Sequence, residues 1–247
     1  MDRMIYIGMG GAKQAMEQQA AVANNMANVS TPGFRAQINM ARAVPVVGQE
    51  AATRAMVVAI TPGASMRSGP MTQTGRPLDV AIHGDGWLSV QTPDGGEAYT
   101  RAGNLQVGAD GQLLTMDSLP LLGDAGPLVV PPGSSLSVTT DGMVTAIGAG
   151  GPAAGAAEVG RLKLVNPTAK DLVRGDDGLF RMRAGLPAPQ ADPAVKLLTG
   201  TIEGSNVNAV EAMVDMIANA RRFEMQMKTL QTAENNDQQA TKLLSHS

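Results

Sequence analysis

The 247-residue chain contains no cysteine. This excludes disulfide bonds, thiolate nucleophiles and cysteine-ligated metal sites. Aromatic residues make up only 2% of the chain, and histidine occurs twice. Two histidines offer few possibilities for a serine–histidine hydrolase or for a histidine-ligated metal site. The composition favours a structural or binding role, and we expect no enzymatic activity and no cofactor.

The sequence also lacks long apolar runs and basic clusters. No run approaches the roughly 20 apolar residues of a membrane-spanning helix, so we expect no direct membrane insertion. The net charge is −3, and no Lys/Arg run could follow a phosphate backbone, so we expect no nucleic-acid partner. Residues 1–6 lack the apolar segment of a secretory signal, and Asp2 stands where such a signal is basic. Any export is expected to proceed without a cleavable signal peptide.

Two motifs could suggest a ligand site. Asp79, His83 and Asp85 would share one face of a strand, but the other histidine, His246, is far away in sequence. We therefore expect a solvated His83 and no metal. The Gly/Ala-rich segment 148–157 lacks the Gly-Lys-Ser/Thr ending of a phosphate-binding loop. It is expected to be a flexible surface loop, and no small-molecule substrate is expected.

Methionine, in contrast, is abundant, with 16 residues, and many of them lie near the two ends of the chain. Over residues 2–28, apolar positions recur every three or four residues, which is typical of one helical seam with a single polar member. That seam comprises Ile5, Met9, Ala12, Met16, Gln19, Ala23 and Met26. Pro32 and Gly33 follow and are expected to end the helix.

A second helix is expected over about 207–244. Its seam has the same spacing and comprises Met213, Met216, Ala220, Phe223, Met227 and Leu230. Asn208 is a suitable N-cap, with Glu211 three residues later in a capping-box arrangement. Neither terminal helix can bury its apolar seam alone, so each needs the other terminus or a neighbouring chain as a partner.

The interior of the chain has a different character. Asp-Gly pairs at 85–86, 94–95, 110–111, 141–142 and 177–178 lie near β-prone runs at 78–82, 87–91, 128–130, 136–140 and 162–165. An Asp-Gly pair between short apolar runs is a strong hairpin signal. The pattern predicts a mostly antiparallel sheet or small barrel. Residues 36–75 show no clear period and are interpreted as an extended connector.

The predicted fold class is therefore α+β, with long terminal helices that form a coiled coil and a central, mostly antiparallel β domain. The expected division is the N-terminal helix at 1–35, the connector at 36–75, the β domain at 76–200 and the C-terminal helix at 201–247.

Asparagines gather near both helices. Capping explains Asn28 and Asn208, but Asn24 and Asn25 lie inside the first helix, where asparagine is unfavourable. We expect their side chains to hydrogen-bond to another chain or to the connector.

Residues 23–35, Ala-Asn-Asn-Met-Ala-Asn-Val-Ser-Thr-Pro-Gly-Phe-Arg, closely resemble the signature that closes the N-terminal helix in flagellar rod and hook proteins. Residues 78–87 followed by 99–104 resemble the central β segment of that family. Residues 203–210, and 220–224 with Lys228, resemble its C-terminal helix. The resemblance extends along the whole chain in the expected order.

This resemblance implies a structural subunit of the flagellar basal-body rod, which spans the periplasm and transmits motor torque. It also implies self-assembly through a terminal coiled coil, contacts with copies of itself and with proximal and distal rod proteins, and passage through the flagellar type III export apparatus. The opening residues and the short length resemble the proximal-rod members. A distal-rod protein, or a secreted β-domain adhesion or interaction protein oligomerised by terminal helices, are the alternatives.

The helical pattern, the asparagines and the resemblance together predict an assembly interface. Its expected residues are Ile5, Met9, Ala12, Met16, Ala23, Asn24, Asn25, Met26, Asn28, Phe34, Arg35, Ser205, Asn206, Val207, Asn208, Met213, Met216, Phe223, Met227 and Leu230.

Overall fold

A computed structural model describes residues 2–45, 55–148 and 156–245. The chain separates into two compact units. The helical unit comprises Met1–Val29, Ala36–Ser65 and Val207–Ser247, and the β unit comprises Ser30–Arg35 and Met66–Asn206. The two terminal helices and the central antiparallel strands confirm the α+β class.

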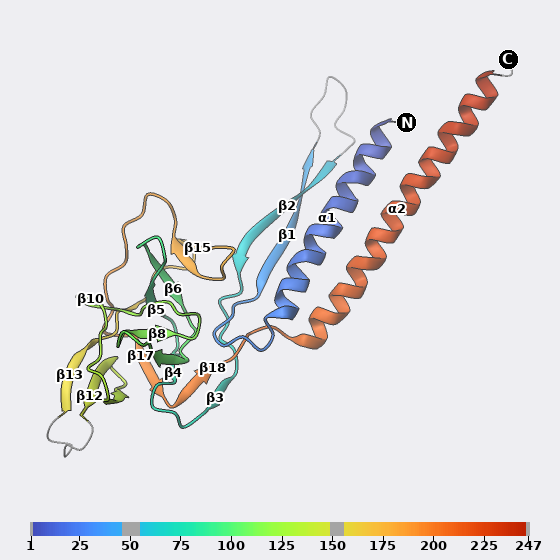
Figure 1. Cartoon of the computed structure of the whole chain (residues 1–247). Coiled ribbons are helices and arrows are strands. Elements are labelled where there is room, and N and C mark those ends of the chain that lie inside the picture. Colours follow the sequence, from blue (N-terminus) through green and yellow to red (C-terminus); the bar gives the residue numbers. More distant parts are fainter. Residues whose placement is uncertain (1, 46–54, 149–155, 246–247) are drawn as a thin grey trace. The chain divides into compact units, whose positions relative to one another are not determined.

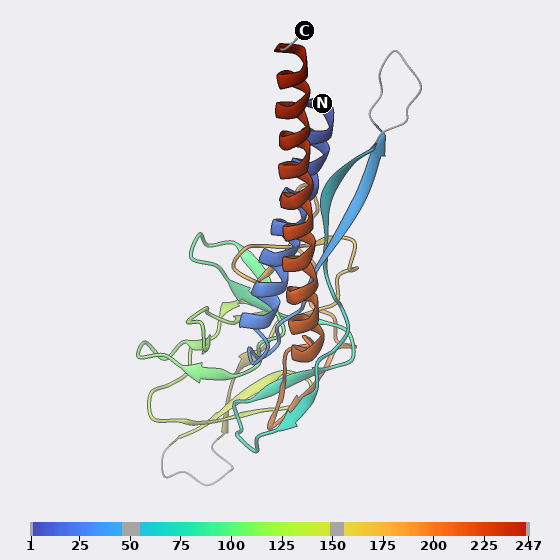
Figure 2. The ribbon, with the colours of Figure 1, turned by 90° about the vertical axis from the view of Figure 1, so that its right-hand side faces the viewer.

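The helical unit contains α1 (Asp2–Ala27) and α2 (Ala209–Ser245). The two helices lie side by side and run in opposite directions (Figures 1 and 2). The first and last residues of both helices agree to within two residues with the ranges expected from the sequence, 2–28 and about 207–244. The predicted N-cap of α2 is confirmed, because Asn208 Oδ1 accepts hydrogen bonds from the backbone N–H of Val210 at 3.0 Å and of Glu211 at 3.4 Å.

The helical unit also contains a β-hairpin that packs along α1 (Figure 1). Strand β1 (Gln37–Pro45) pairs antiparallel with β2 (Ala55–Ala64), with an irregularity between Ile38 and Met40. This hairpin lies within the segment 36–75, where the sequence showed no strand period. Its turn falls outside the described residues.

The β unit is built from many short strands. They are β3 (Met71–Gln73), β4 (Val80–His83), β5 (Trp87–Gln91), β6 (Glu97–Thr100), β7 (Leu105–Val107), β8 (Leu113–Thr115), β9 (Leu122–Gly123), β10 (Gly126–Pro127), β11 (Ser135–Val138), β12 (Met143–Ile147), β13 (Ala156–Arg161), β14 (Leu164–Val165), β15 (Leu172–Arg174), β16 (Phe180–Met182), β17 (Lys196–Thr199) and β18 (Thr201–Glu203). The largest sheet has the order β14-β5-β6-β16-β15, and a second has the order β11-β12-β13. The remaining strands form antiparallel pairs, β17-β4, β18-β3, β7-β8 and β10-β9.

Four of the five Asp-Gly pairs form hairpin turns, as predicted. They join β5 to β6 at 94–95, β7 to β8 at 110–111, β11 to β12 at 141–142, and β15 to β16 at 177–178. The pair at 85–86 instead links β4 to β5, which belong to different sheets, so the hairpin prediction was wrong there. All five glycines have positive φ angles, which suits glycine at every one of these turns.

The core of the β unit is aliphatic. It is a cluster of valine, leucine, isoleucine and alanine side chains, and none of its buried members is a methionine. The run 128–130 contributes to this core through Leu128 and Val130, although it forms an isolated bridge at Val129 and no strand. Of the expected loop at 148–157, residues 149–155 lie outside the described residues, and 156–157 begin β13.

Two further observations concern metal binding and membrane-spanning helices. Within the described residues, no group of three or more His, Asp or Glu side chains could hold a metal ion, and His83 is exposed at the end of β4. No described helix is long and apolar enough to cross a membrane.

Candidate functional site

The contact between α1 and α2 is made by small side chains on α1. A Cβ atom added at Gly8 would lie 2.6 Å from Cδ2 of Leu230, and one added at Gly11 would lie 2.9 Å from the side chain of Gln226. Ala12 and Ala15 are also buried. Small residues allow the helix backbones to approach closely, so glycine and alanine bring the two helices together.

The positions on this contact repeat every three or four residues on both helices, and we call them the inner seam. The inner seam comprises Gly8, Ala12, Ala15, Gln19, Val22 and Met26 on α1, and Ala212, Met216, Asn219, Phe223, Gln226, Leu230 and Ala233 on α2. Asn219 is a buried polar member, as is typical of a position that fixes helix register.

The predicted seams coincide with the inner seam at every second position. Ala12, Gln19 and Met26 on α1 lie on it, as do Met216, Phe223 and Leu230 on α2. Each of the other described positions of the predicted seams comes one residue after an inner-seam residue and so lies beside the contact. The physical reason is that each apolar stripe is wider than the contact between the two helices, and close approach selects Gly8 and Ala15 over the adjacent methionines.

These displaced positions form what we call the outer face, namely Met9, Met16, Ala23, Met213, Ala220 and Met227. All six are exposed, and the methionines are 55%, 61%, 51% and 39% exposed in chain order. Each follows a seam residue by one position. Two antiparallel helices are related by a two-fold axis perpendicular to the plane that contains both helix axes. A residue one position after the inner seam therefore points to the same side of that plane on both helices. The outer face is therefore one apolar surface shared by α1 and α2.

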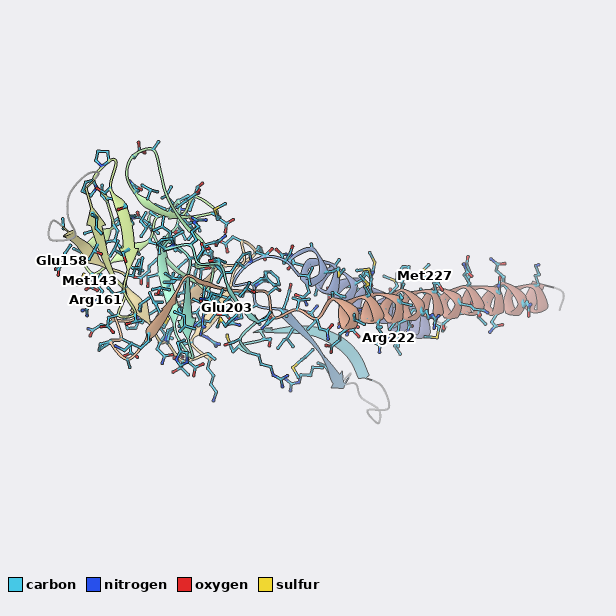
Figure 3. The ribbon with its side chains drawn as sticks, turned by 90° about the horizontal axis from the view of Figure 1, so that it is seen from below. Met143, Glu158, Arg161, Glu203, Arg222 and Met227 are labelled. Carbon is cyan, nitrogen blue, oxygen red and sulfur yellow. The ribbon has the colours of Figure 1, made fainter. Side chains whose placement is uncertain are left out.

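The hairpin packs against α1, on the side of that helix away from the outer face. Asn25, which precedes the seam residue Met26, donates from Nδ2 to the carbonyl of Gln37 at 3.0 Å and accepts from the Gln37 N–H at 2.7 Å. Asn39 Nδ2 donates to the carbonyl of Glu17 at 3.2 Å. The helix-interior Asn25 thus hydrogen-bonds to the segment that follows α1, one of the two expected partners. In Figure 3, Arg222 lies on the hairpin side of α2 and Met227 on the other.

The other predicted residues near the helix ends have simpler surroundings. Asn24 is exposed, and its carbonyl accepts a hydrogen bond from Asn28 Nδ2 at 2.9 Å. Ile5 lies in α1, and its side chain is outside the described part of the structure. Val207 is half-buried just before α2.

One predicted residue, Arg35, meets the carboxylate of Glu203 in the β unit. Glu203 is labelled in Figure 3. Arg35 Nη1 lies 2.7 Å from Glu203 Oε1, and Arg101 Nη1 lies 3.1 Å from Oε2. The three side chains are 1%, 4% and 0% exposed for Arg35, Arg101 and Glu203. The backbone N–H of Gly69 also donates to Oε1 at 3.0 Å. We call Arg35, Arg101 and Glu203 the Glu203 cluster.

Two positive charges and one negative charge are buried in this cluster. Burial lowers the pKa of the Arg35 and Arg101 guanidiniums from their ordinary value, and the Glu203 carboxylate raises both in opposition. The ring of Trp87 lies 5.5 Å from the Arg101 guanidinium and 6.0 Å from that of Arg35. An aromatic face stabilises a cation, so Trp87, together with the Asp85 carboxylate, supports the charge that Glu203 leaves uncompensated.

The Glu203 cluster joins three segments of the chain. Gly33 N–H donates to the Glu203 carbonyl at 2.7 Å, and Asn206 N–H donates to the Phe34 carbonyl at 3.2 Å. Asn206 Nδ2 donates to the Arg67 carbonyl at 2.7 Å, and this carbonyl also accepts from Arg35 Nη1. The chain crosses between its two units after Val29, Arg35, Ser65 and Asn206, and each crossing is close in sequence to one of these segments. The cluster therefore holds together all the points at which the chain leaves the β unit.

Two other predicted residues complete this region. The ring of Phe34 lies 4.9 Å from the guanidinium of Arg174, and Ser205 is buried. The sequence predicted Arg35, Ser205 and Asn206 as interface residues, but it did not identify Glu203 as a site residue. It missed the partner role of Arg101, because the sequence around it carries no signal of a buried charge.

Three family models match the chain in order. A model described as "Flagella basal body rod protein" matches residues 5–35, and one described as "Flagellar hook protein FlgE/F/G D1 domain" matches residues 81–146. A third, "Flagellar basal body rod FlgEFG protein C-terminal", matches residues 198–243.

Similar proteins cover the full length. The chain is 53% identical to the flagellar basal-body rod protein FlgF of Escherichia coli (strain K12), over 100% of both chains. It is 52% identical, with the same coverage, to the protein of that name in Salmonella typhimurium. The flagellar basal-body rod protein FlgG of Agrobacterium fabrum is more distant, at 30% identity over 94% of this chain and 95% of its own.

Proposed function

Because this chain belongs to the flagellar basal-body rod protein family, in which it is a structural subunit of the rod, we propose that its helical unit carries the assembly contacts. The 53% identity to the Escherichia coli FlgF protein, against 30% to the Agrobacterium fabrum FlgG protein, favours this reading over a distal-rod subunit or a secreted adhesion protein. On this proposal the protein acts without catalysis, and other rod proteins and its own copies are its partners.

The observation that carries the proposal is the outer face. Six exposed alanine and methionine residues form one side of the helix pair, and the hairpin packs against α1 away from this surface. The apolar surface continues round the start of α2 to Val210, Val214 and Ile217, which are 71%, 60% and 56% exposed. Contiguous exposed apolar surface of this kind marks an interaction site.

In the assembled rod, the outer face would pack against helices of adjacent subunits, so that each helix pair becomes part of a larger coiled coil. Methionine suits this role because its unbranched side chain adapts to partners that differ slightly. Side-by-side helices joined in this way would transmit motor torque. The subunit would reach the rod through the flagellar type III export apparatus without a cleavable signal peptide.

We also propose the domain division predicted from the sequence, except that residues 36–65 would belong with the helices and not to a separate connector. The segment 36–65 would act together with the helices, because its hairpin packs on α1 and is held by Asn25. The β domain would then begin after Ser65 and end at Asn206, and the remaining predicted interface residues near Glu203 would belong to the β unit.

The test places charge on the outer face. Met16→Glu and Met213→Glu would be introduced together, and a strain lacking the native gene would be complemented with this variant. We expect loss of swimming and absence of the variant from isolated basal bodies, with unchanged thermal unfolding of the purified chain. The matched control is Met116→Glu, since Met116 is 53% exposed in the β unit. Normal swimming and normal incorporation of the double variant would refute the proposal.

A further inference from the structure

Methionine is a surface residue in the described part of this protein. Of the 16 methionines in the chain, none with a described side chain belongs to the buried core. Eight are strongly exposed, namely Met9, Met16, Met40, Met71, Met116, Met213, Met225 and Met227. This distribution is unusual, because methionine is normally among the buried residue types.

Four of these exposed residues, Met9, Met16, Met213 and Met227, lie on the outer face. The chain has no cysteine that could react first with an oxidant. Thioethers at 39–61% exposure are open to solvent before assembly. They are therefore the oxidisable groups on the surface that carries the proposed assembly contacts.

We propose that Met9, Met16, Met213 and Met227 form an oxidation-sensitive site, and that their conversion to methionine sulfoxide prevents the subunit from joining the rod. This inference rests on the proposed function of the outer face. The oxidant class is a hydroperoxide such as hydrogen peroxide. Its O–O bond breaks, one oxygen forms an S–O bond with the thioether, and the other leaves as water. The sulfur is oxidised and the peroxide is reduced.

The effect follows from the change in side-chain chemistry. A sulfoxide is a polar, chiral group with a strong hydrogen-bond acceptor, and on the outer face it would replace an apolar thioether. Burying that acceptor against an apolar neighbour leaves it unpaired, which disfavours association. The β unit should remain folded, since none of the described residues of its core is a methionine.

The test compares two pools of the same chain. Cells without methionine sulfoxide reductases would express the protein while another rod protein is withheld. They would receive a hydrogen peroxide pulse, then catalase, and only then the withheld protein. Mass spectrometry would measure sulfoxide at each methionine in the chain retained in basal bodies and in the unincorporated chain. The internal controls are Met71 and Met116, which are 40% and 53% exposed in the β unit.

We expect sulfoxide at the four outer-face positions to be depleted about tenfold in the incorporated pool, which is the effect of roughly one unpaired polar group. Sulfoxide at Met71 and Met116 should be equal in both pools. Leucine at all four outer-face positions should restore incorporation after the pulse. Equal sulfoxide occupancy at the four positions in both pools would overturn the inference.

The two proposals can fail separately. If the glutamate variant at positions 16 and 213 joins the rod normally, the outer face is not the assembly surface and both proposals fall. If that variant is excluded while sulfoxide-bearing chains are incorporated freely, only the oxidation-sensitive site is disproved.

Discussion

Arg35 and Glu203 lie at opposite ends of the β unit in sequence, yet their charged groups are 2.7 Å apart and both side chains are almost completely buried. Arg101 shares the same carboxylate. A buried ion pair seldom adds stability in itself, because desolvation offsets the attraction. Removal of one partner, however, leaves an uncompensated buried charge. The ion pair therefore fixes the segment that follows α1 against the segment that precedes α2.

The first prediction concerns this carboxylate. Glu203→Gln should lower the free energy of unfolding by about 3–5 kcal/mol, because two buried guanidiniums lose their counter-charge. Thermal or urea unfolding measures the effect. Asp141→Asn is the control, since Asp141 forms an exposed pair with Lys196 at 2.6 Å, and it should leave the stability almost unchanged. A Glu203→Gln protein as stable as the control would contradict this account.

The second prediction concerns Gly33, which has a φ of +70°. A Cβ atom there would lie 2.3 Å from backbone atoms of Arg101 and Ala102. Gly33→Ala should therefore destabilise the β unit by well over the roughly 1 kcal/mol that a positive φ alone costs. Gly95→Ala is the matched control, because Gly95 has a φ of +79° but no atom within 4 Å of the added carbon. Similar unfolding midpoints for the two variants would show that the collision is relieved.

The third prediction compares two glycines of α1. Gly10 has nothing within 4 Å of an added Cβ atom, whereas at Gly8 that atom would meet Leu230 at 2.6 Å. Gly10→Ala should raise stability by about 0.5–1 kcal/mol through helix propensity. Gly8→Ala should gain less or lose stability, because Leu230 must move. Circular dichroism during thermal unfolding distinguishes the two, and a larger gain from Gly8→Ala would argue against the close helix approach.

The fourth prediction is a pH dependence. Two hydrogen bonds from Arg181, at 3.0 and 2.6 Å, lower the pKa of the Asp177 carboxyl. A carboxyl whose folded pKa is lowered adds stability above its unfolded pKa of about 3.9, and this is lost as the pH falls through the folded pKa. Because Asp177 is 43% exposed, the contribution should be under about 1 kcal/mol.

Urea unfolding of the wild type and of Asp177→Asn at several pH values checks this. The stability difference should be constant from pH 5 to 7 and should shrink below about pH 4. Arg181→Met should remove the same pH-dependent part. A difference that grows as the pH falls would have the wrong sign.

The sequence predicted those features that depend on neighbouring residues. Asn208 caps α2, and four Asp-Gly pairs form hairpins, because capping and positive-φ turns are set by a few adjacent side chains. The expected helices also appeared at both ends. These features required no knowledge of distant contacts.

The features that depend on distant contacts were predicted only in part. The predicted seams contained Met9 and Met213, although the closer helix contact is made through Gly8 and Ala212, since periodicity cannot show how near two backbones come. The β1–β2 hairpin was not identified, because its residues lack a clear alternation of apolar and polar side chains. The pairing of Arg101 with Glu203 could not be read from either sequence neighbourhood.

The position of the Glu203 cluster has a mechanical consequence. Tension applied to the chain on the far side of Arg35, Met66 or Asn206 reaches the β unit at segments that this cluster ties to one another. Displacing any one of these segments requires breaking the buried ion pairs and the backbone hydrogen bonds that join it to the others. A structural subunit of the rod benefits from this arrangement, because a load on one segment is shared among three.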